Sequence, residues 1–319
     1  AHLLLTSGTA SGKTEAALLP ILTLLAAHPS TSLGVLYIGP TKALINDQFY
    51  RLQGLLEEAN IPVWSWHGDV GASQKQRLLQ NPSGVLQITP ESLEGLLINR
   101  TDYLQALFQD LRFVVIDEVH VFMGADRGQQ IMCQLGRLAR YTQVEPRRVG
   151  LSATLGDTTL AQRWLASGSR RRALVPQVPV AGQRLRLSLE HFVRPESEAE
   201  NAQEDPYYSY IFEQSRGRKC LIFANRRSET EAVIAAMRQI AAGSGHPDIY
   251  HVHHGSIAPA LRQTAEAAMR DPYCPAVTAA TVTLELGIDL GQLETIIQLD
   301  APHSVMSWLQ RLGRSGRRG

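Results

Sequence analysis

The sequence is poor in cysteine and in lysine. Its 319 residues include only three cysteines, Cys133, Cys220 and Cys274, which lie far apart and form no C-x-x-C pair. This spacing argues against a disulfide framework, a zinc knuckle or an iron–sulfur cluster, and it predicts a protein of the reducing cytoplasm. Only four lysines occur, at positions 13, 42, 75 and 219, and two of them lie in motifs described below.

Long apolar runs and an excess of one charge are also missing. No stretch of ~18 apolar residues occurs, so no membrane-spanning helix is predicted. With 31 basic and 30 acidic residues the net charge is +1, which excludes a strong global field for a polyanionic partner. Any contact with nucleic acid must therefore come from a local groove. The length of 319 residues suffices for about two domains of ~150 residues.

Short runs rich in Val and Ile alternate with helical patterns, which indicates parallel β-sheets covered by helices on both faces. In the first half, strands are predicted at His2–Thr6, Gly34–Ile38, Val63–His67, Val85–Thr89, Phe113–Asp117 and Arg148–Ser152. Helices are predicted at Lys13–Ala26, Leu44–Ala59, Ser73–Asn81, Pro90–Ile98 and Gly128–Tyr141. The pattern stops around Leu174–Gly182, where a domain boundary is predicted.

A second alternation follows this boundary. It begins with a predicted strand at Arg184–Phe192 and an exposed polar loop at Pro195–Pro206. Further strands are predicted at Lys219–Ala224, Ile249–His253, Ala276–Ala280 and Thr295–Leu299, with helices at Ser228–Ala242, Pro259–Arg270 and Ser304–Leu312. The fold class is therefore α/β, with two doubly wound parallel-sheet domains in tandem over residues 1–178 and 179–319.

A loop of small residues follows the first predicted strand and opens a helix. It reads Ser7, Gly8, Thr9, Ala10, Ser11, Gly12, Lys13, Thr14. Main-chain N–H groups of such a loop wrap a phosphate chain, and the helix amino terminus adds positive partial charge. Lys13 would then reach the β and γ phosphates, and the Thr14 hydroxyl would ligate Mg²⁺. Ser7 stands where the strict pattern has Gly. Taken alone, Gly-Lys-Thr after a strand could also be a chance turn with a solvated lysine.

Two carboxylates and a histidine, Asp117, Glu118 and His120, follow an apolar strand. At the carboxyl end of a strand beside the phosphate loop, Asp117 can hold the Mg²⁺ shell, and Glu118 can act as general base on the attacking water. A solvated acidic turn is the alternative. His120 is either a core histidine or a link between ATP state and domain contacts. The hydroxyls of Ser152 and Thr154 could hydrogen-bond His120 or Asp117, or could cap a helix.

Arginines and glycines alternate at the carboxyl end, from Gln310 to Arg318. The glycines allow a tight turn that presents guanidinium groups forward. Arginines of one domain that neutralise charge on a γ-phosphate held by another domain act as arginine fingers. The alternative is a disordered basic tail.

The order of these motifs resembles that of superfamily 2 helicases across essentially the whole chain. The matching runs begin at Ser7, Pro40, Thr89, Asp117, Ser152, Thr281 and Gln310. Finer details resemble the Lhr-like branch, with the YprA/MrfA-like DNA repair helicases as a neighbouring possibility. They are Asp-Glu-Val-His at 117–120, His-His-Gly-Ser at 253–256, Leu-Glu-Leu-Gly-Ile-Asp at 284–289 and Gln-Arg-x-Gly-Arg at 310–314.

The resemblance implies two tandem RecA-like domains that hydrolyse Mg·ATP at the cleft between them. The motor would move along single-stranded or tailed duplex nucleic acid, with DNA favoured over RNA and a 3′ to 5′ direction. Catalytic residues would be Lys13, Asp117, Glu118, Gln310, Arg314 and Arg317, and nucleotide binding would add residues 8–14, Gly287 and Asp289. His120, Ser152 and Thr154 would couple the state of the bound ATP to contacts between the domains. The nucleic-acid track would hold Pro40, Thr41, Lys42, Gly68, Thr89, Pro90, Glu91, Asn225, Arg226, His254, Gly255, Thr281 and Thr283.

The sequence departs from the family pattern in two places. Ala10 stands where the family usually has Gly, which would stiffen the loop slightly. The upstream segment that normally recognises adenine precedes the first residue given, so the chain is interpreted as the motor core of a larger protein. Two other functions stay open. One is a nucleic-acid-gated ATPase that clamps without separating strands, and the other is a non-enzymatic scaffold, against which the intact Lys13 and Glu118 argue.

Two further sequence features are interpreted as having no role in the site. His251, His253 and His254 could suggest a metal site, but strand geometry would send His254 to the opposite face from the other two. The basic runs at 169–172 and 216–219 are predicted to be solvated faces.

Overall fold

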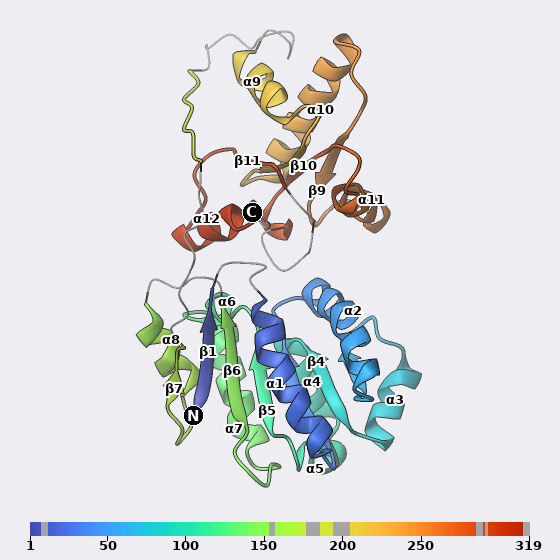
Figure 1. The fold of residues 1–319 in the computed structure, drawn as a ribbon, viewed down its shortest axis with the longest axis vertical. Coiled ribbons are helices and arrows are strands. Elements are labelled where there is room, and N and C mark those ends of the chain that lie inside the picture. Colours follow the sequence, from blue (N-terminus) through green and yellow to red (C-terminus); the bar gives the residue numbers. More distant parts are fainter. Residues whose placement is uncertain are drawn as a thin grey trace. The chain divides into compact units, whose positions relative to one another are not determined.

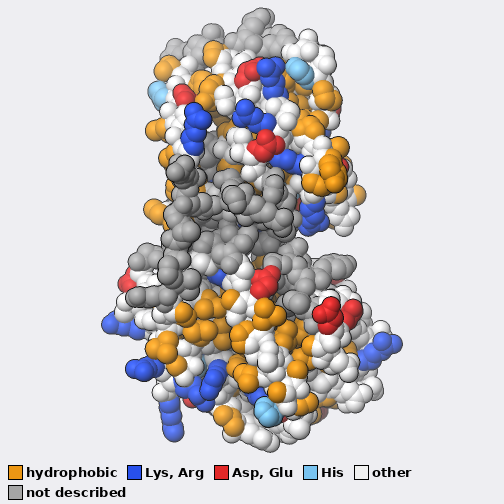
Figure 2. All heavy atoms as spheres, viewed as in Figure 1, with side chains coloured by type: hydrophobic (Ala, Val, Ile, Leu, Met, Phe, Trp, Pro, Cys, Tyr) orange, Lys and Arg blue, Asp and Glu red, His pale blue; other side chains and the backbone are white. Residues whose placement is uncertain are grey.

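The computed structural model describes residues 1–7, 12–152, 157–176, 186–193, 205–284, 290 and 293–314. The chain divides into two compact units, Ala1–Val178 and Pro179–Gly319, which are described separately (Figure 1). On the face shown in Figure 2, both units carry basic and acidic side chains.

The first unit is built on a seven-stranded parallel sheet of order β3-β4-β2-β5-β6-β1-β7. Its strands are β1 (His2–Thr6), β2 (Leu33–Ile38), β3 (Val63–Trp66), β4 (Gly84–Ile88), β5 (Phe113–Ile116), β6 (Arg147–Ser152) and β7 (Ala173–Leu174). Its helices are α1 (Lys13–Ala27), α2 (Lys42–Glu58), α3 (Ala72–Gln80), α4 (Pro90–Asn99), α5 (Leu104–Phe108), α6 (Val119–Phe122), α7 (Asp126–Leu138) and α8 (Thr158–Leu165).

Helices bury both faces of this sheet. On one face Val35, Tyr37 and Val115 pack with residues of α1, which crosses the sheet in Figure 1. On the other face Leu36 and Ile116 pack with residues of α3, α4, α5, α7 and α8. Successive residues of a strand point to opposite faces, so a strand covered on both sides needs an unbroken apolar run. The predicted doubly wound parallel architecture is confirmed.

The second unit has a four-stranded parallel sheet of order β11-β8-β10-β9. Its strands are β8 (Lys219–Phe223), β9 (Tyr250–His253), β10 (Ala276–Ala280) and β11 (Thr295–Gln298), and its helices are α9 (Pro206–Ser215), α10 (Arg227–Gly243), α11 (Pro259–Arg270) and α12 (Val305–Leu312). One face packs on α9 and α10, and the other packs on α11. Helix α9 was not predicted from the sequence.

The strand predicted at Arg184–Phe192 is wrong over its described part. Residues 186–193 have no regular secondary structure. Leu187 and Leu189, which create the alternating pattern, are 61% and 94% exposed. Period-two alternation is stabilising only when one face of a paired strand is buried, and this segment pairs with no described strand.

The prediction of a solvated basic face at 216–219 is wrong for Lys219, which is only 7% exposed. Its Nζ donates to the main-chain oxygens of Ala268 and Met269, with the second bond at 3.0 Å. These carbonyls lie in the last turn of α11, where a helix offers unpaired acceptors and negative partial charge. Lys219 therefore fastens the end of α11 to the first residue of β8.

His2 ties the start of β1 to neighbouring loops of the first unit. Its ring lies 2.7 Å from the Ser169 hydroxyl through Nε2, and its Nδ1 accepts the main-chain N–H of Arg148 at 2.9 Å. Burial, assisted by the charge of Arg148, lowers the pKa of His2 from 6.5 to about 4. Ser169, a member of the predicted solvated run at 169–172, thus lies in a partly buried hydrogen-bond network.

Stability of the first unit should therefore fall as the pH falls from 6.5 towards 4. In that window the unfolded chain takes up a proton on His2, whereas the folded chain does not, so protonation favours unfolding. A His2→Gln variant should lose about 2 kcal/mol less of its free energy of unfolding across the same window. Urea titrations at several pH values measure this slope. The exposed His28→Gln variant is the control, and equal slopes for both variants would contradict the prediction.

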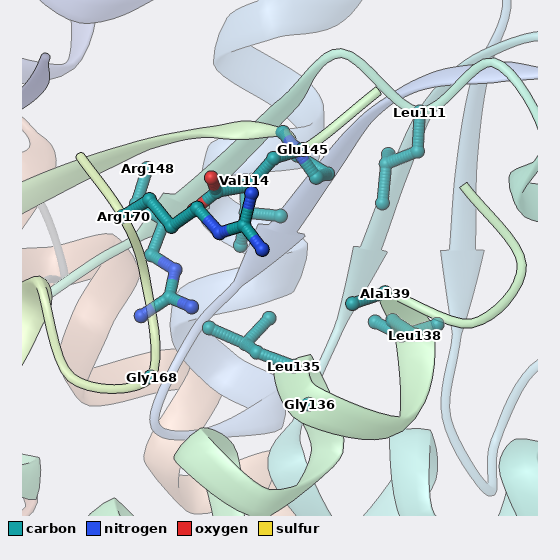
Figure 3. Close-up of a pocket in the computed structure, with 11 residues that line it drawn as sticks. Leu111, Val114, Leu135, Gly136, Leu138, Ala139, Glu145, Arg148, Gly168 and Arg170 are labelled. Atoms are coloured by element: carbon teal, nitrogen blue, oxygen red, sulfur yellow. The ribbon is translucent and has the colours of Figure 1, made fainter. Parts of the chain in front are cut away.

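A hollow of about 170 Å³ lies at the amino ends of β5 and β6 (Figure 3). Leu111, Val114 and Leu135 form part of its wall, and the side chains of Arg148 and Arg170 border it. Ligands of open parallel sheets bind at the carboxyl ends of the strands. The hollow is therefore at the wrong edge of the sheet to be the candidate nucleotide site.

Candidate active site

The phosphate-binding segment is described at its two ends only, because residues 8–11 lie outside the described part of the chain. Ser7 donates its main-chain N–H to the Ser152 carbonyl at 3.3 Å, and Gly12 precedes α1 with φ 80°. That left-handed conformation favours glycine. Lys13 is the first residue of α1, and its Nζ donates to the Ser7 carbonyl at 2.7 Å. The Lys13 ammonium group thus points back to the residue that follows β1.

The carboxylates Asp117 and Glu118 lie at the carboxyl end of β5 and are 5% and 9% exposed. The Glu118 main-chain N–H donates to Asp117 Oδ1 at 2.9 Å, and the Tyr37 hydroxyl donates to Asp117 Oδ2 at 2.5 Å. Glu118 has φ 51°, a left-handed conformation that is uncommon for a residue with a side chain. Backbone strain of this kind is concentrated at functional sites. The solvated acidic turn is therefore excluded.

His120 joins this carboxylate pair to the neighbouring strand β6. Its Nδ1 lies 2.9 Å from Ser152 Oγ, and its Nε2 lies 3.5 Å from Glu118 Oε2. Burial, assisted by the charge of Lys13, lowers the His120 pKa to about 4, so the ring is neutral at pH 7. A neutral imidazole offers one N–H and one lone pair, which suits a carboxylate on one side and a hydroxyl on the other. The Ser152 contact is the one expected from the sequence, whereas the coupling role of both residues stays a prediction, and Thr154 lies outside the described residues.

The oxygen donors at this edge suit Mg²⁺. Magnesium prefers hard oxygen ligands and usually takes one or two from the protein. Asp117 supplies a buried carboxylate whose two oxygens each accept a hydrogen bond, and Thr14 supplies a half-buried hydroxyl in the first turn of α1. The side chains therefore fit the predicted metal.

Two predicted segments of the nucleic-acid track in the first unit are joined by Arg127, a residue that sequence reasoning missed. Its side chain donates to both carboxylate oxygens of Glu91 at 2.6 and 3.1 Å and to the Pro40 carbonyl at 2.7 Å. Thr89 caps α4 by accepting the Ser92 N–H at 3.3 Å. Burial raises the pKa of Glu91, but the Arg127 hydrogen bonds outweigh it and the net shift is downward. Glu91 is thus neutralised by a partner rather than presented to a phosphate chain.

Removing this bridge should weaken nucleic-acid binding. An Arg127→Met variant would release Glu91 as an unpaired negative charge and untie the Pro40 loop. We expect the nucleic-acid concentration for half-maximal ATPase stimulation to rise about tenfold, since hydrogen bonds to charged groups contribute ~1.5–3 kcal/mol. The matched control is Arg137→Met, which breaks an ion pair with Glu94 between the same two helices. An equal rise in the control would show that the effect comes from general destabilisation.

The other track residues of the first unit lie around Lys42. Its Nζ is 3.4 Å from a carboxylate oxygen of Asp69, and both side chains are largely exposed. Gly68 lies close by, because a Cβ added there would lie 3.2 Å from the Lys42 ammonium. Thr41 Oγ1 accepts the Leu44 N–H at 3.3 Å at the start of α2. Lys42 is the cation of this group available for a phosphate, since its exposed ion pair is weak.

The predicted track residues of the second unit gather at the carboxyl ends of β8, β9 and β10. Asn225 Nδ2 donates to the Ala301 carbonyl at 2.8 Å, and His254 lies 2.9 Å from Glu231. Thr283 Oγ1 lies 2.9 Å from His253 Nδ1, whose other ring nitrogen lies 3.1 Å from Glu266. In the described part of the chain no group of three His, Cys, Asp or Glu side chains could hold a metal ion.

The remaining track residues lie nearby in the chain. Arg226 precedes α10, and its main-chain N–H donates to a carboxylate oxygen of Glu229 at 3.2 Å. Thr281 is buried and follows β10 directly, and Gly255 follows β9 by two positions. These positions share one edge of the sheet because the strands are parallel.

Helix α12 carries the described part of the arginine motif. Ser304 caps it by accepting the Ser307 N–H at 3.1 Å. Arg311, which was not predicted to have a role, is buried, donates to Gln298 Oε1 at 2.7 Å and lies over the Phe223 ring. It therefore anchors α12 to β11 and β8. Gln310 and Arg314 lie on and just after this helix, whereas Arg317, Gly287 and Asp289 are outside the described residues.

Comparisons with known families and structures agree with this arrangement. Residues 1–162 match the profile of the DEAD/DEAH box helicases, and residues 204–319 match the helicase conserved C-terminal domain. The chain belongs to the DEAD/DEAH box helicase family. Among the residues that the structure describes, no helix of this family member combines the length and hydrophobicity needed to cross a bilayer. The predicted cytoplasmic location stays a prediction.

Similar proteins place this helicase chain in the Lhr-like branch of superfamily 2. It is 31% identical to the Lhr helicase/uracil glycosylase of Escherichia coli, over 99% of this chain and 24% of that protein. It is 30% identical to the ATP-dependent helicase Lhr-Core of Saccharolobus solfataricus, over 99% of this chain and 38% of that protein. The chain thus spans well under half of these relatives.

Solved structures confirm the two tandem RecA-like domains. A structure of Mycobacterium smegmatis helicase Lhr bound to ssDNA and AMP-PNP matches with a TM-score of 0.81 and 30% identity, over 99% of this chain and 42% of that chain. A structure of the helicase MrfA bound to DNA shares the fold, with a TM-score of 0.78 and 23% identity over all of this chain and 45% of that one. The resemblance predicted from the motifs is therefore confirmed.

Proposed function

We propose that the chain is the ATP-hydrolysing motor of a helicase that moves 3′ to 5′ along single-stranded DNA. The observation that carries the proposal is the buried group at the carboxyl end of β5. There Glu118 lies 3.5 Å from a neutral His120, beside an Asp117 that is held by two hydrogen-bond donors. This is the geometry of a fixed general base next to a metal-binding carboxylate.

Each residue of the first unit has a distinct task in this proposal. The loop at 8–12 and Lys13 would bind the β and γ phosphates of ATP, and Thr14 and Asp117 would hold Mg²⁺. When bound, Mg²⁺ would supply neutralisation of the phosphate charge. Glu118 takes a proton from water as the water oxygen bonds to the γ-phosphorus, and the bond from that phosphorus to the ADP oxygen breaks. His120 orients the Glu118 carboxylate and links it to Ser152 on β6.

Residues of the second unit complete the proposed site. Gln310, Arg314 and Arg317 approach the γ-phosphate and stabilise the charge that it develops, and Gly287 and Asp289 line the nucleotide. The support for this step is the order of the motifs and the family profile that matches residues 204–319. The longer relatives support a parent protein with further domains.

The proposed DNA track uses main-chain N–H groups, hydroxyls and few cations. The support is the M. smegmatis relative bound to ssDNA. The near-zero net charge of this chain is compatible with such a track, because the contacts would be local. Contacts to phosphate and sugar position a strand without reading its sequence. The Lys42 ammonium, the exposed Arg226 guanidinium and the hydroxyls of Thr41 and Thr283 suit such sequence-independent binding.

The experiment that tests the proposal measures ATP turnover with single-stranded DNA and with RNA of the same sequence. We expect stimulation by DNA to exceed stimulation by RNA. A fluorescent duplex with a 3′ tail should then be unwound, and the same duplex with a 5′ tail should not. A Lys13→Ala protein is the control for contaminating ATPases. DNA-dependent turnover with no unwinding of either duplex would favour a clamp instead.

A further inference from the structure

We infer that Tyr37 is a positioning residue for the metal-binding carboxylate of Asp117. This inference rests on the proposed function, because it assigns Tyr37 a task in preparing the same site. Tyr37 lies on β2, which pairs with β5 in the centre of the seven-stranded sheet. It belongs to none of the motifs that carry the family resemblance.

The contact that carries the inference is a hydrogen bond of 2.5 Å from the Tyr37 hydroxyl to Asp117 Oδ2. In the sheet register Tyr37 lies beside Val115, two residues before Asp117. Residues two apart on a strand share a face. The ring of Tyr37 therefore extends along the sheet towards the carboxyl end of β5, where its hydroxyl meets the carboxylate.

The ring of Tyr37 is held in place by packing. Its side chain is 0% exposed and lies in the cluster formed by α1 and the strands, with Leu18, Leu22 and Val115. Close packing on this scale locks a side chain in one rotamer. The hydroxyl is thus a donor at a fixed position, and its bond to an ionised acceptor is of the strong, charge-assisted kind.

The acceptor of this hydrogen bond is a carboxylate rather than a neutral group. A hydrogen bond to an ionised acceptor is roughly twice as strong as one between neutral groups. The bond therefore holds the Asp117 side chain more firmly than a neutral pair would.

Asp117 gains a fixed orientation from the arrangement. The Glu118 main-chain N–H holds Oδ1 and the Tyr37 hydroxyl holds Oδ2, so the plane of the carboxylate is set from both sides. A carboxylate oxygen carries two lone pairs, so accepting one hydrogen bond does not by itself prevent it from ligating a metal. Groups that orient a metal ligand in this way change metal affinity by about 10- to 100-fold when they are removed.

The test is a Tyr37→Phe protein, which removes the hydroxyl and keeps the ring. We expect Mn²⁺ to bind about tenfold more weakly in the presence of a non-hydrolysable ATP analogue, measured by electron paramagnetic resonance. The Mg²⁺ concentration for half-maximal ATPase activity should rise by a similar factor. Affinity for the same analogue in EDTA should stay unchanged, which a general loss of packing would not allow.

Tyr250→Phe is the matched control, because Tyr250 is a buried strand tyrosine of the second unit with 2% exposure. Its Mn²⁺ affinity should equal that of the unchanged protein. The double variant Tyr37→Phe with Asp117→Asn should bind Mn²⁺ no more weakly than Asp117→Asn alone, because Tyr37 acts through Asp117. Unchanged Mn²⁺ affinity in Tyr37→Phe, with Asp117→Asn strongly impaired, would overturn the inference and leave the proposed function intact. Normal turnover in Asp117→Asn would overturn the proposed function itself.

Discussion

A Glu118→Gln protein is expected to bind ATP normally and to hydrolyse it at least ~100-fold more slowly, because a positioned general base contributes 10²- to 10⁴-fold. Glutamine keeps the shape of the side chain and its contact with His120, 3.5 Å away, but it cannot accept a proton from water. Single-turnover hydrolysis with excess protein measures the chemical step, and fluorescence titration with a labelled ATP analogue measures binding.

A conservative change at another buried carboxylate contact provides the control for Glu118. Glu266→Gln alters the partner of His253 in the second unit, 3.1 Å away, and lies outside the proposed catalytic group. Its single-turnover rate should remain close to that of the unchanged protein. Turnover by Glu118→Gln at the normal rate would remove Glu118 from the mechanism, whereas loss of ATP binding would assign it a structural task.

Arg317→Ala should reduce ATP turnover about 10³-fold while leaving nucleotide affinity nearly intact. An arginine that neutralises charge on the γ-phosphate acts mainly in the transition state, and such arginines contribute 10³- to 10⁵-fold. The effect should therefore fall on kcat, with a small change in KM. Steady-state ATPase measurements with saturating single-stranded DNA separate the two constants.

The neighbouring arginine provides a matched comparison for Arg317. Arg318→Ala removes the same charge one position further along the chain, and it should retain most of the turnover. Comparable losses in both variants would indicate a general electrostatic effect of the basic carboxyl-terminal run. Full activity in Arg317→Ala would contradict its role as an arginine finger.

Elements with continuous apolar runs were predicted to within a few residues. Strands β1 and β10 were predicted with the bounds that the structure shows. Such strands can be recognised in the sequence because burial on both faces of a parallel sheet requires a nearly continuous run of apolar residues. The strand predicted at Arg184–Phe192 was wrong over its described part. Alternation of apolar and polar residues indicates which face of a strand would be buried, but it does not show that a neighbouring strand is present to pair with it.

The candidate site was predictable where a motif places reacting groups a few positions apart. Asp117, Glu118 and His120 are close in sequence, and local geometry brings them together after β5. Arg127 and Tyr37 could not be found in this way. Arg127 reaches Glu91 from 36 positions away, and Tyr37 reaches Asp117 from 80 positions away. Neither contact could be predicted from the spacing of residues within a motif.

The sequence by itself determined the fold class, the family and the identities of the groups proposed to carry the chemistry, because periodic burial and short motifs are local properties of the chain. Tertiary structure alone decided which partners fix those groups. It placed a tyrosine hydroxyl on the carboxylate proposed to bind metal, an arginine between two predicted track segments and Lys219 on the end of α11. Such contacts depend on strand order and register, which bring distant residues together and are not encoded in any one stretch of sequence.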